Sequence, residues 1–194
     1  MAKVKAPLMS FDARGQIAKS LVYLGWKGLK TVRQYVIPAN PKSSDQQTQR
    51  GFFSAAVDDW HTDGFTQLDV DAWNLLALAS KVALSGFNML VKLKVICAVA
   101  EESWVALVDC LITAIASDGA QINVTGTVGS TIKLYWGVSK TAMVNEEDMA
   151  DTAGDYEVTI ATMSPTTKYY FYIKDTDAGE QARTGIYSFT TLAA

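Results

Sequence analysis

The spacing of hydrophobic residues changes character at about residue 117. Between residues 43 and 116 apolar side chains recur at intervals of three and four, the period of an amphipathic helix. Beyond that point they recur every second residue, the period of a half-buried strand. A turn-forming Ser-Asp-Gly at 117–119 separates the two patterns. We therefore predict an α+β N-terminal domain over residues 1–117 and an all-β domain over 118–194.

Five segments of the second half are predicted strands, and turn-forming residues separate them. Short strands at this spacing are typical of an antiparallel β-sandwich. In the fourth segment, strict alternation directs Tyr170 and Tyr172 away from the core face, so both are candidates for a surface contact on the sandwich. The five predicted segments are 121–128, 131–138, 156–163, 168–175 and 185–192.

The approach to the fourth predicted strand carries a recognisable motif. Met163, Pro165, Thr167 and Tyr169 resemble the Leu-x-Pro-x-Thr-x-Tyr element of fibronectin type III domains, with methionine in place of leucine. The closing strand 186–191 (IYSFTT) is similar as well. The resemblance implies a display or spacer module in which the aromatic residue locks a tyrosine corner. That family has seven strands, so edge strands are either missing here or lie within 140–155.

The N-terminal segment predicts a β-hairpin. Residues 17–24 and 29–37 are rich in β-branched and aromatic residues, and GWKG at 25–28 permits a tight reversal between them. Trp26 lies near the tip, where a large apolar side chain is free to dock. The PANP segment at 38–41 then stops strand pairing.

Three helical regions are predicted between the hairpin and the sandwich. Ser43 and Ser44 offer N-caps for a helix that ends near 61–64. A second helix begins near 68–71, and a third region follows Ser85-Gly86 and runs to about residue 116. Apolar stripes support the first and third regions, formed by Phe53, Val57 and Trp60 and by Trp104, Leu107, Leu111 and Ile115.

The two ends of the chain differ in charge, although the whole carries only −3. Residues 1–50 hold nine basic residues against two acidic, a net +7, whereas 51–194 hold eight against eighteen, a net −10. Such separation is consistent either with oriented contacts or with ordinary solvated surfaces on two domains. The candidate interface consists of the aromatic and basic residues of the N-terminal segment: Trp26, Lys27, Lys30, Arg33, Tyr35 and Arg50.

Patterns typical of catalysis or metal binding are weak. The single histidine, His61, stands at a predicted helix end, a position that helix dipoles favour by themselves. No GxSxG elbow or phosphate-binding glycine loop is present. Cys97 and Cys110 lie in an apolar segment and fit buried free thiols. We expect no enzymatic activity, no catalytic residue, no metal and no cofactor.

The N-terminal run resembles a group of tailed-phage and prophage proteins. It reads GQIAKSLVYLGWKGLKTVRQYVIPANPKSSDQQTQRGFFSAAVDDW over 15–60, followed by LDVDAWN at 68–74 and SGFNMLV at 85–91. The resemblance implies a virion structural protein, a capsid decoration or accessory subunit anchored by its N-terminal domain and displaying the sandwich. Partners would be other copies of itself and other virion proteins.

Two other functions remain open. The basic N-terminal 50 residues suggest a nucleic-acid-binding accessory protein, although the dispersed cations make nucleic acid the less favoured partner. Tyr170 and Tyr172 suggest a module that adheres to host-surface glycans. The basic start lacks an apolar signal segment, and the longest apolar zone is interrupted by charges. We therefore expect synthesis in a host cytoplasm, location in the virion and no membrane partner.

Overall fold

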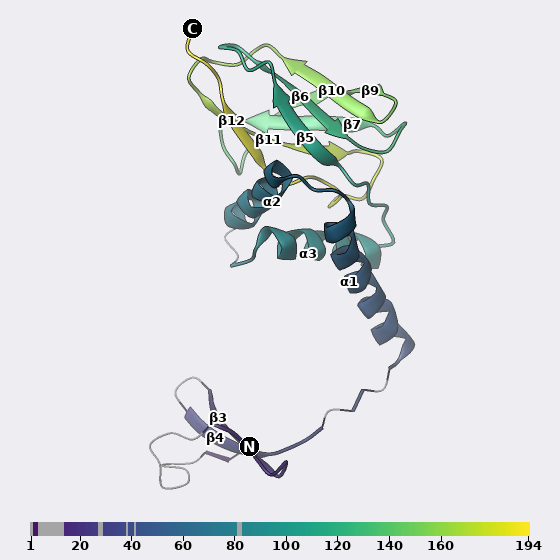
Figure 1. Cartoon of the computed structure of the whole chain (residues 1–194), viewed down its shortest axis with the longest axis vertical. Helices are drawn as coiled ribbons and strands as arrows, with labels where there is room; N and C mark the ends of the chain where they lie inside the picture. Colours follow the sequence, from purple (N-terminus) through teal and green to yellow (C-terminus); the bar gives the residue numbers. More distant parts are fainter. Residues whose placement is uncertain (1, 4–13, 27–28, 38, 41, 81–82) are drawn as a thin grey trace. The chain divides into compact units, whose positions relative to one another are not determined.

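A computed structural model describes residues 2–3, 14–26, 29–37, 39–40, 42–80 and 83–194 of the chain. Contacts divide the chain into two compact units, Met1–Ser43 and Ser44–Ala194. Figure 1 labels most of the elements of both units.

The first unit is one antiparallel sheet with strand order β1-β4-β3-β2. The predicted hairpin is confirmed: β3 and β4 pair from Leu21 with Gln34 to Trp26 with Leu29. Two short strands extend the sheet on either side. The strands are β1 (Ala2–Lys3), β2 (Gly15–Ile17), β3 (Leu21–Trp26) and β4 (Leu29–Gln34).

The predicted first strand, 17–24, is wrong in extent because the chain reverses within it. Ala18 and Lys19 have φ angles of 44° and 55°, and the Ser20 amide donates to the Ile17 carbonyl at 2.8 Å. Two consecutive residues with positive φ match the twist of a tight hairpin. Sequence reasoning missed this turn because such positions usually hold asparagine or glycine.

Three helices begin the second unit: α1 (Ser44–Thr62), α2 (Gln67–Ala79) and α3 (Gly86–Val99). The side chains of Thr66 and Ser85 cap α2 and α3 by accepting backbone amides of the first turn. One correction concerns the predicted stripe of α1, because Phe53 is 56% exposed. The helices share a core of Ala56, Trp73, Ala77, Met89, Leu90, Val91 and Leu93.

The rest of this unit is a sandwich of two antiparallel four-stranded sheets, ordered β5-β6-β10-β9 and β12-β11-β7-β8. All five predicted strands are present, and β8 and β9 lie in 140–155, the segment where edge strands were expected. The strands are β5 (Val108–Thr113), β6 (Ala120–Thr125), β7 (Ile132–Gly137), β8 (Asn145–Asp148), β9 (Ala150–Thr152), β10 (Asp155–Ile160), β11 (Lys168–Asp175) and β12 (Tyr187–Thr190).

The third predicted helical region, which was expected to run to about residue 116, is wrong beyond Val99, because α3 ends there and β5 then pairs with β6. The ladder shifts between Val108 and Leu111, where three steps along β5 match two along β6. Asp109, with φ of 54°, lies inside this bulge. Leu107 and Cys110 therefore both face the core three positions apart, while Leu111 is 51% exposed. The sandwich thus begins before residue 118.

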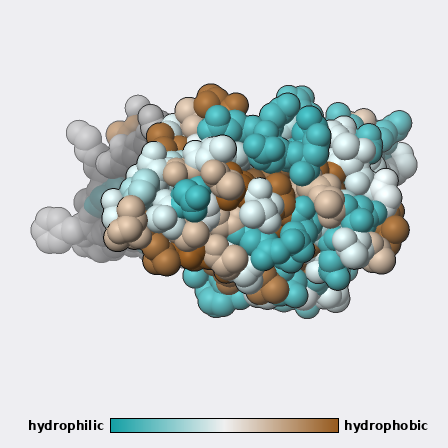
Figure 2. All heavy atoms as spheres, turned by 90° about the horizontal axis from the view of Figure 1, so that it is seen from above, coloured by the Kyte–Doolittle hydropathy of each residue, from teal (hydrophilic) through white to brown (hydrophobic). Residues whose placement is uncertain are grey.

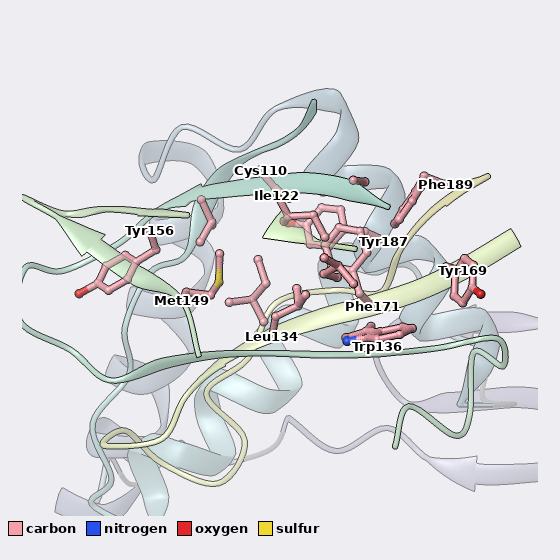
Figure 3. Packing of buried hydrophobic residues seen from close by; sticks show 14 of the residues in the cluster. Cys110, Ile122, Leu134, Trp136, Met149, Tyr156, Tyr169, Phe171, Tyr187 and Phe189 are labelled. Carbon is pink, nitrogen blue, oxygen red and sulfur yellow. The ribbon is translucent and has the colours of Figure 1, made fainter. Parts of the chain in front are cut away.

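The sandwich core is aromatic and closes with the predicted tyrosine corner. Tyr169 is buried, and its hydroxyl accepts the Ser164 amide at 2.9 Å. Phe171 stacks on Tyr187 with ring centroids 5.0 Å apart. These side chains meet between the two sheets in Figure 3, with Phe189 inward as predicted. The strand order and this corner make the domain a fibronectin type III-like β-sandwich.

Helix α2 packs against one side of the sandwich, where the edge strands β5 and β12 lie (Figure 1). The Ile186 amide donates to the Ala72 carbonyl at 3.0 Å. Gly185 permits this approach, since a Cβ there would lie 2.4 Å from the Trp73 amide nitrogen. Covering an edge in this way removes a template for unwanted strand pairing. The opposite edges, β8 and β9, carry the exposed acidic residues Glu146, Glu147, Asp148 and Asp151.

Candidate functional site

The N-terminal sheet presents apolar side chains on both faces. Residues that pair directly across a ladder share a face. Ile17 pairs with Leu21 on one face, whereas Leu24 pairs with Thr31 on the other. Among the side chains described in this unit, Thr31 alone is buried, and Ile17 and Leu21 are about 40% exposed. The unit therefore has no closed core in the part of the chain that the structure describes.

The basic residues predicted for the interface do not share one face of this sheet. Lys30 pairs with Gly25, and Arg33 pairs with Val22. Positions separated by three along a strand point to opposite faces. Lys30 is half-buried and Arg33 is exposed. A single flat partner therefore cannot engage both cations in the same way.

The remaining predicted interface residues are spread over the chain. Trp26 ends β3 opposite Leu29, and Lys27 lies outside the described residues. Tyr35 follows β4, and its amide donates to the Ser20 carbonyl at 2.8 Å, which closes the base of the hairpin. Arg50 is exposed on α1 and belongs to the second unit.

The two predicted surface tyrosines of β11 have different surroundings. Tyr172 stacks on Tyr135 of β7, with centroids 5.0 Å apart and ring planes 12° apart. On its other side, the Arg183 guanidinium carbon lies 3.8 Å from the ring centroid. Because β7 and the Arg183 segment flank β11 on opposite sides, both faces of the Tyr172 ring are occupied. The Lys168 ammonium group lies over the Tyr170 ring, 5.5 Å from its centroid.

Burial perturbs the titration of this stack. The pKa of the Tyr172 hydroxyl is raised, chiefly because burial disfavours the phenolate, while the Arg183 charge opposes the rise. Burial likewise lowers the pKa of Arg183, since it disfavours the guanidinium charge. A cation held in a partly desolvated place is a common feature of anion-binding surfaces.

A buried carboxylate that sequence reasoning assigned only to a helix start joins the helices to the sandwich. Asp69 of α2 is 0% exposed and accepts the Tyr187 hydroxyl at 2.6 Å. It also accepts the amides of Asp109 at 3.1 Å and Cys110 at 3.4 Å, and the Thr66 hydroxyl at 2.8 Å. The Thr66-x-x-Asp69 capping-box spacing was visible in the sequence, but its long-range partners were not.

The described residues hold no cluster that could bind a metal ion. No three histidine, cysteine, aspartate or glutamate side chains among them come together around a point that could hold an ion. His61 stands in the last turn of α1. Cys97 and Cys110 are free and buried, as predicted. No helix in the described part of the chain is both long and apolar enough to cross a bilayer.

The surface seen in Figure 2 is a mosaic in which hydrophilic residues and smaller hydrophobic groups are interspersed. No broad apolar area occupies this face. A mosaic of this kind is ordinary for the surface of a folded domain, where apolar atoms contribute a large share of the exposed area.

Comparisons with known proteins support no function. No family model matches the chain, and no curated protein matches it. Among solved structures, the FN5 domain of Drosophila Lar is 16% identical, with 45% of this chain and 96% of that one covered, at a TM-score of 0.36. The sensor domain of the anti-sigma factor RsgI4 of Pseudobacteroides cellulosolvens is 22% identical, with 48% and 96% covered, at a TM-score of 0.34.

A third similar structure, that of PhoD, is 13% identical, and the match covers 44% of this chain but only 19% of PhoD, with a TM-score of 0.38. Scores this low add no argument of their own. The fibronectin type III-like assignment stands on the strand order and the tyrosine corner.

Proposed function

We propose that this protein is a non-enzymatic structural subunit of a tailed-phage virion, a decoration or accessory protein whose N-terminal sheet docks on the particle while the sandwich is displayed. The observation that carries the proposal is the open sheet of the first unit. It places apolar residues on both faces, yet Thr31 is its one buried residue among the described side chains.

Such a sheet gains stability when a partner covers it. A few strands without a packed hydrophobic face are marginal in water. Ile17, Leu21 and Leu29 are 40–44% exposed, and burying the remainder of each contributes roughly 1 kcal/mol or less at about 25 cal/mol per Å². One contact of this kind is weak, but a symmetric particle repeats it many times and thereby strengthens attachment.

Charge supports a contact with acidic surfaces. Residues 1–50 carry a net +7, and residues 51–194 a net −10. A neighbouring copy of the sandwich offers acidic edge strands, so homo-oligomeric packing of basic sheet against acidic edge is favoured electrostatically. The resemblance of the 15–60 run to tailed-phage proteins directs the proposal to a virion.

The proposal is tested by the presence of the protein on purified particles. We expect the chain to co-purify with phage particles at a fixed copy number through a density gradient. Leu29→Asp removes the apolar burial of this side chain and adds the cost of desolvating an unpaired carboxylate, so it should lower that copy number at least about tenfold, a loss of about 1.4 kcal/mol. Val128→Asp is the matched control, because Val128 is also apolar and is 65% exposed on the sandwich. This variant should leave the copy number unchanged.

Particles that lack the wild-type protein, with all of it soluble in the producing cell, would overturn the proposal. Equal losses from both variants would show that the sheet is not the anchor.

The geometry favours neither alternative function. Lys30 and Arg33 face opposite sides of the sheet, which weakens a nucleic-acid groove. Both faces of the Tyr172 ring are covered, which removes it as a platform for sugar stacking. Salt-dependent DNA retention on filters at about 0.15 M salt would restore the first alternative, and binding on a glycan array would restore the second.

A further inference from the structure

A pocket beside the Tyr172–Arg183 stack has the composition of a ligand site. Its volume is about 440 Å³, and it lies between the end of α2, the 140–144 loop and β11. It is separate from the N-terminal sheet, so it bears on a different activity of the protein. Its described lining includes Leu76, Ser80, Lys140, Thr141, Met143, Val144, Tyr172, Arg183 and Ile186.

The charged side chains among the described lining residues of the pocket are both positive. Arg183 and Lys140 line it, whereas no carboxylate is among its described lining residues. The Arg183 guanidinium rests on the Tyr172 ring and makes one long hydrogen bond, from Nε to the Thr184 carbonyl at 3.4 Å. In the described part of the chain it pairs with no acid. Because a guanidinium carries five donors, most of its hydrogen-bonding capacity remains for a ligand.

The Tyr172 ring holds the Arg183 guanidinium in place. Stacking on Tyr135 holds the ring, and the ring holds the guanidinium plane in place. A preorganised fork of this kind suits a planar carboxylate, which accepts two parallel N–H bonds. The hydroxyls of Ser80 and Thr141 also line the pocket, where Ser80 donates to the Ala77 carbonyl at 2.7 Å and Thr141 shares a hydrogen bond with the Ser139 hydroxyl at 3.2 Å. The Arg183 guanidinium is therefore the main donor available to a ligand.

The apolar walls narrow the ligand further. Leu76, Met143, Val144 and Ile186 are aliphatic or thioether side chains, and the one aromatic ring among the described lining residues has both faces occupied. No aromatic face among the described lining residues is free to stack on a sugar ring, whereas an aliphatic side chain fits the apolar surfaces. We propose that the pocket binds a peptide segment in which a carboxylate stands beside an aliphatic side chain.

The test uses a small probe and its neutral isostere on the full-length protein. N-acetyl-leucine carries the carboxylate and the aliphatic chain, and N-acetyl-leucinamide lacks only the charge. In NMR titrations we expect N-acetyl-leucine to shift the Arg183 Nε–H signal and the amides of Ala142 and Met143. The amide should bind at least about tenfold more weakly, as the loss of a charge-assisted pair predicts. Equal shifts by both probes would overturn the proposal.

Three variants distinguish binding in the pocket from attraction by surface charge in general. Arg183→Gln should weaken N-acetyl-leucine binding at least about tenfold, and Met143→Trp, which fills the pocket and keeps the arginine, should abolish it. Lys168→Gln also removes one positive charge. Lys168 lies on the same face of β11 as Tyr172 but outside the pocket, so this variant should bind N-acetyl-leucine like the wild type. The proposal fails if Arg183→Gln and Met143→Trp both bind like the wild type. It also fails if N-acetylneuraminic acid binds more tightly than N-acetyl-leucine, because the pocket would then suit an acidic sugar.

Discussion

At the scale of single residues, Asp69 decides how the helices meet the sandwich. Its carboxylate is fully buried and accepts donors from Thr66, from Tyr187 and from the β5 backbone at 109–110. A buried carboxylate is tolerated only when such donors replace water. Removing it leaves several buried donors without an acceptor, which costs more than the bonds contribute net.

We predict that Asp69→Ala lowers the free energy of unfolding by about 3–5 kcal/mol. Tyr187→Phe removes one donor and leaves the other bonds, so it should cost about 1.5–2 kcal/mol. Urea denaturation of both variants measures these values. Losses below about 1 kcal/mol in both would contradict the assigned role, since that is the range of an ordinary surface change.

Cys110 gives the protein a dependence on alkaline pH. Its thiol pKa is raised from the usual 9.0, first by burial and then by the Asp69 charge. The unfolded chain therefore releases this proton near pH 9 while the folded chain keeps it. Stability is fully present below pH 9 and falls above it, by up to about 1.4 kcal/mol per pH unit for this group.

Cys110→Ala removes this group from the pH dependence. Between pH 9 and 10 the variant should lose stability with a shallower slope than the wild type, because Cys97, whose pKa is also raised by burial, still contributes. Urea midpoints at pH 8, 9 and 10 give both slopes. Identical slopes would show that the Cys110 thiol titrates normally in the folded protein.

At the scale of elements, the sequence predicted the strands with a regular hydrophobic period and missed those that a bulge or a turn interrupts. Five of the seven strands after residue 119 followed from a period of two, and the tyrosine corner followed from one motif. Strand β5 did not, because Leu107 and Leu111 stand at helical spacing in the sequence, whereas the bulged strand buries Leu107 and leaves Leu111 51% exposed. The Ala18–Lys19 turn was also missed, since neither residue signals positive φ.

Helix α2 packs on the β5–β12 side of the sandwich, where Gly185 lies against its backbone. A substitution of this glycine tests the packing. Gly185→Ala would place a Cβ 2.4 Å from the backbone of Ala72 and Trp73, so helix or strand must move. We expect a loss of about 2–4 kcal/mol, the range of a forced overlap in a packed interior.

Gly51→Ala is the matched control for this test. Gly51 lies in α1, and a Cβ there meets no atom within 4 Å. Alanine should therefore stabilise the helix by about 0.5–1 kcal/mol. Thermal unfolding that showed similar changes for both variants would mean that Gly185 does not hold α2 against the sandwich.

The features of the candidate sites that depend on local sequence could be predicted, whereas those that depend on strand pairing could not. Local composition identified the N-terminal hairpin and the outward face of Tyr172. The separation of Lys30 from Arg33 across the sheet required the register. The placement of Arg183 on Tyr172 required the pairing of β11 with the 183 segment, and no local pattern encodes that pairing.

At the scale of the whole molecule, the chain combines a well-packed unit with one that is open. The second unit encloses two hydrophobic clusters joined by Asp69 and the α2 contacts. The first unit buries only Thr31 among its described side chains. A sheet of this kind opens at low free energy unless a surface covers it. This contrast is the basis of our proposal that the N-terminal sheet is the anchor and the sandwich the displayed part.

Hydrogen exchange of the full-length protein, free and on particles, tests this division most directly. In the free protein, amides of β3 and β4 should exchange at least about a hundredfold faster than those of β7 and β11, which corresponds to roughly 2.7 kcal/mol of opening free energy. On particles, β3 and β4 should become protected while the sandwich stays unchanged. Protection of the sheet already complete in the free chain, or protection on particles confined to the sandwich, would contradict the account.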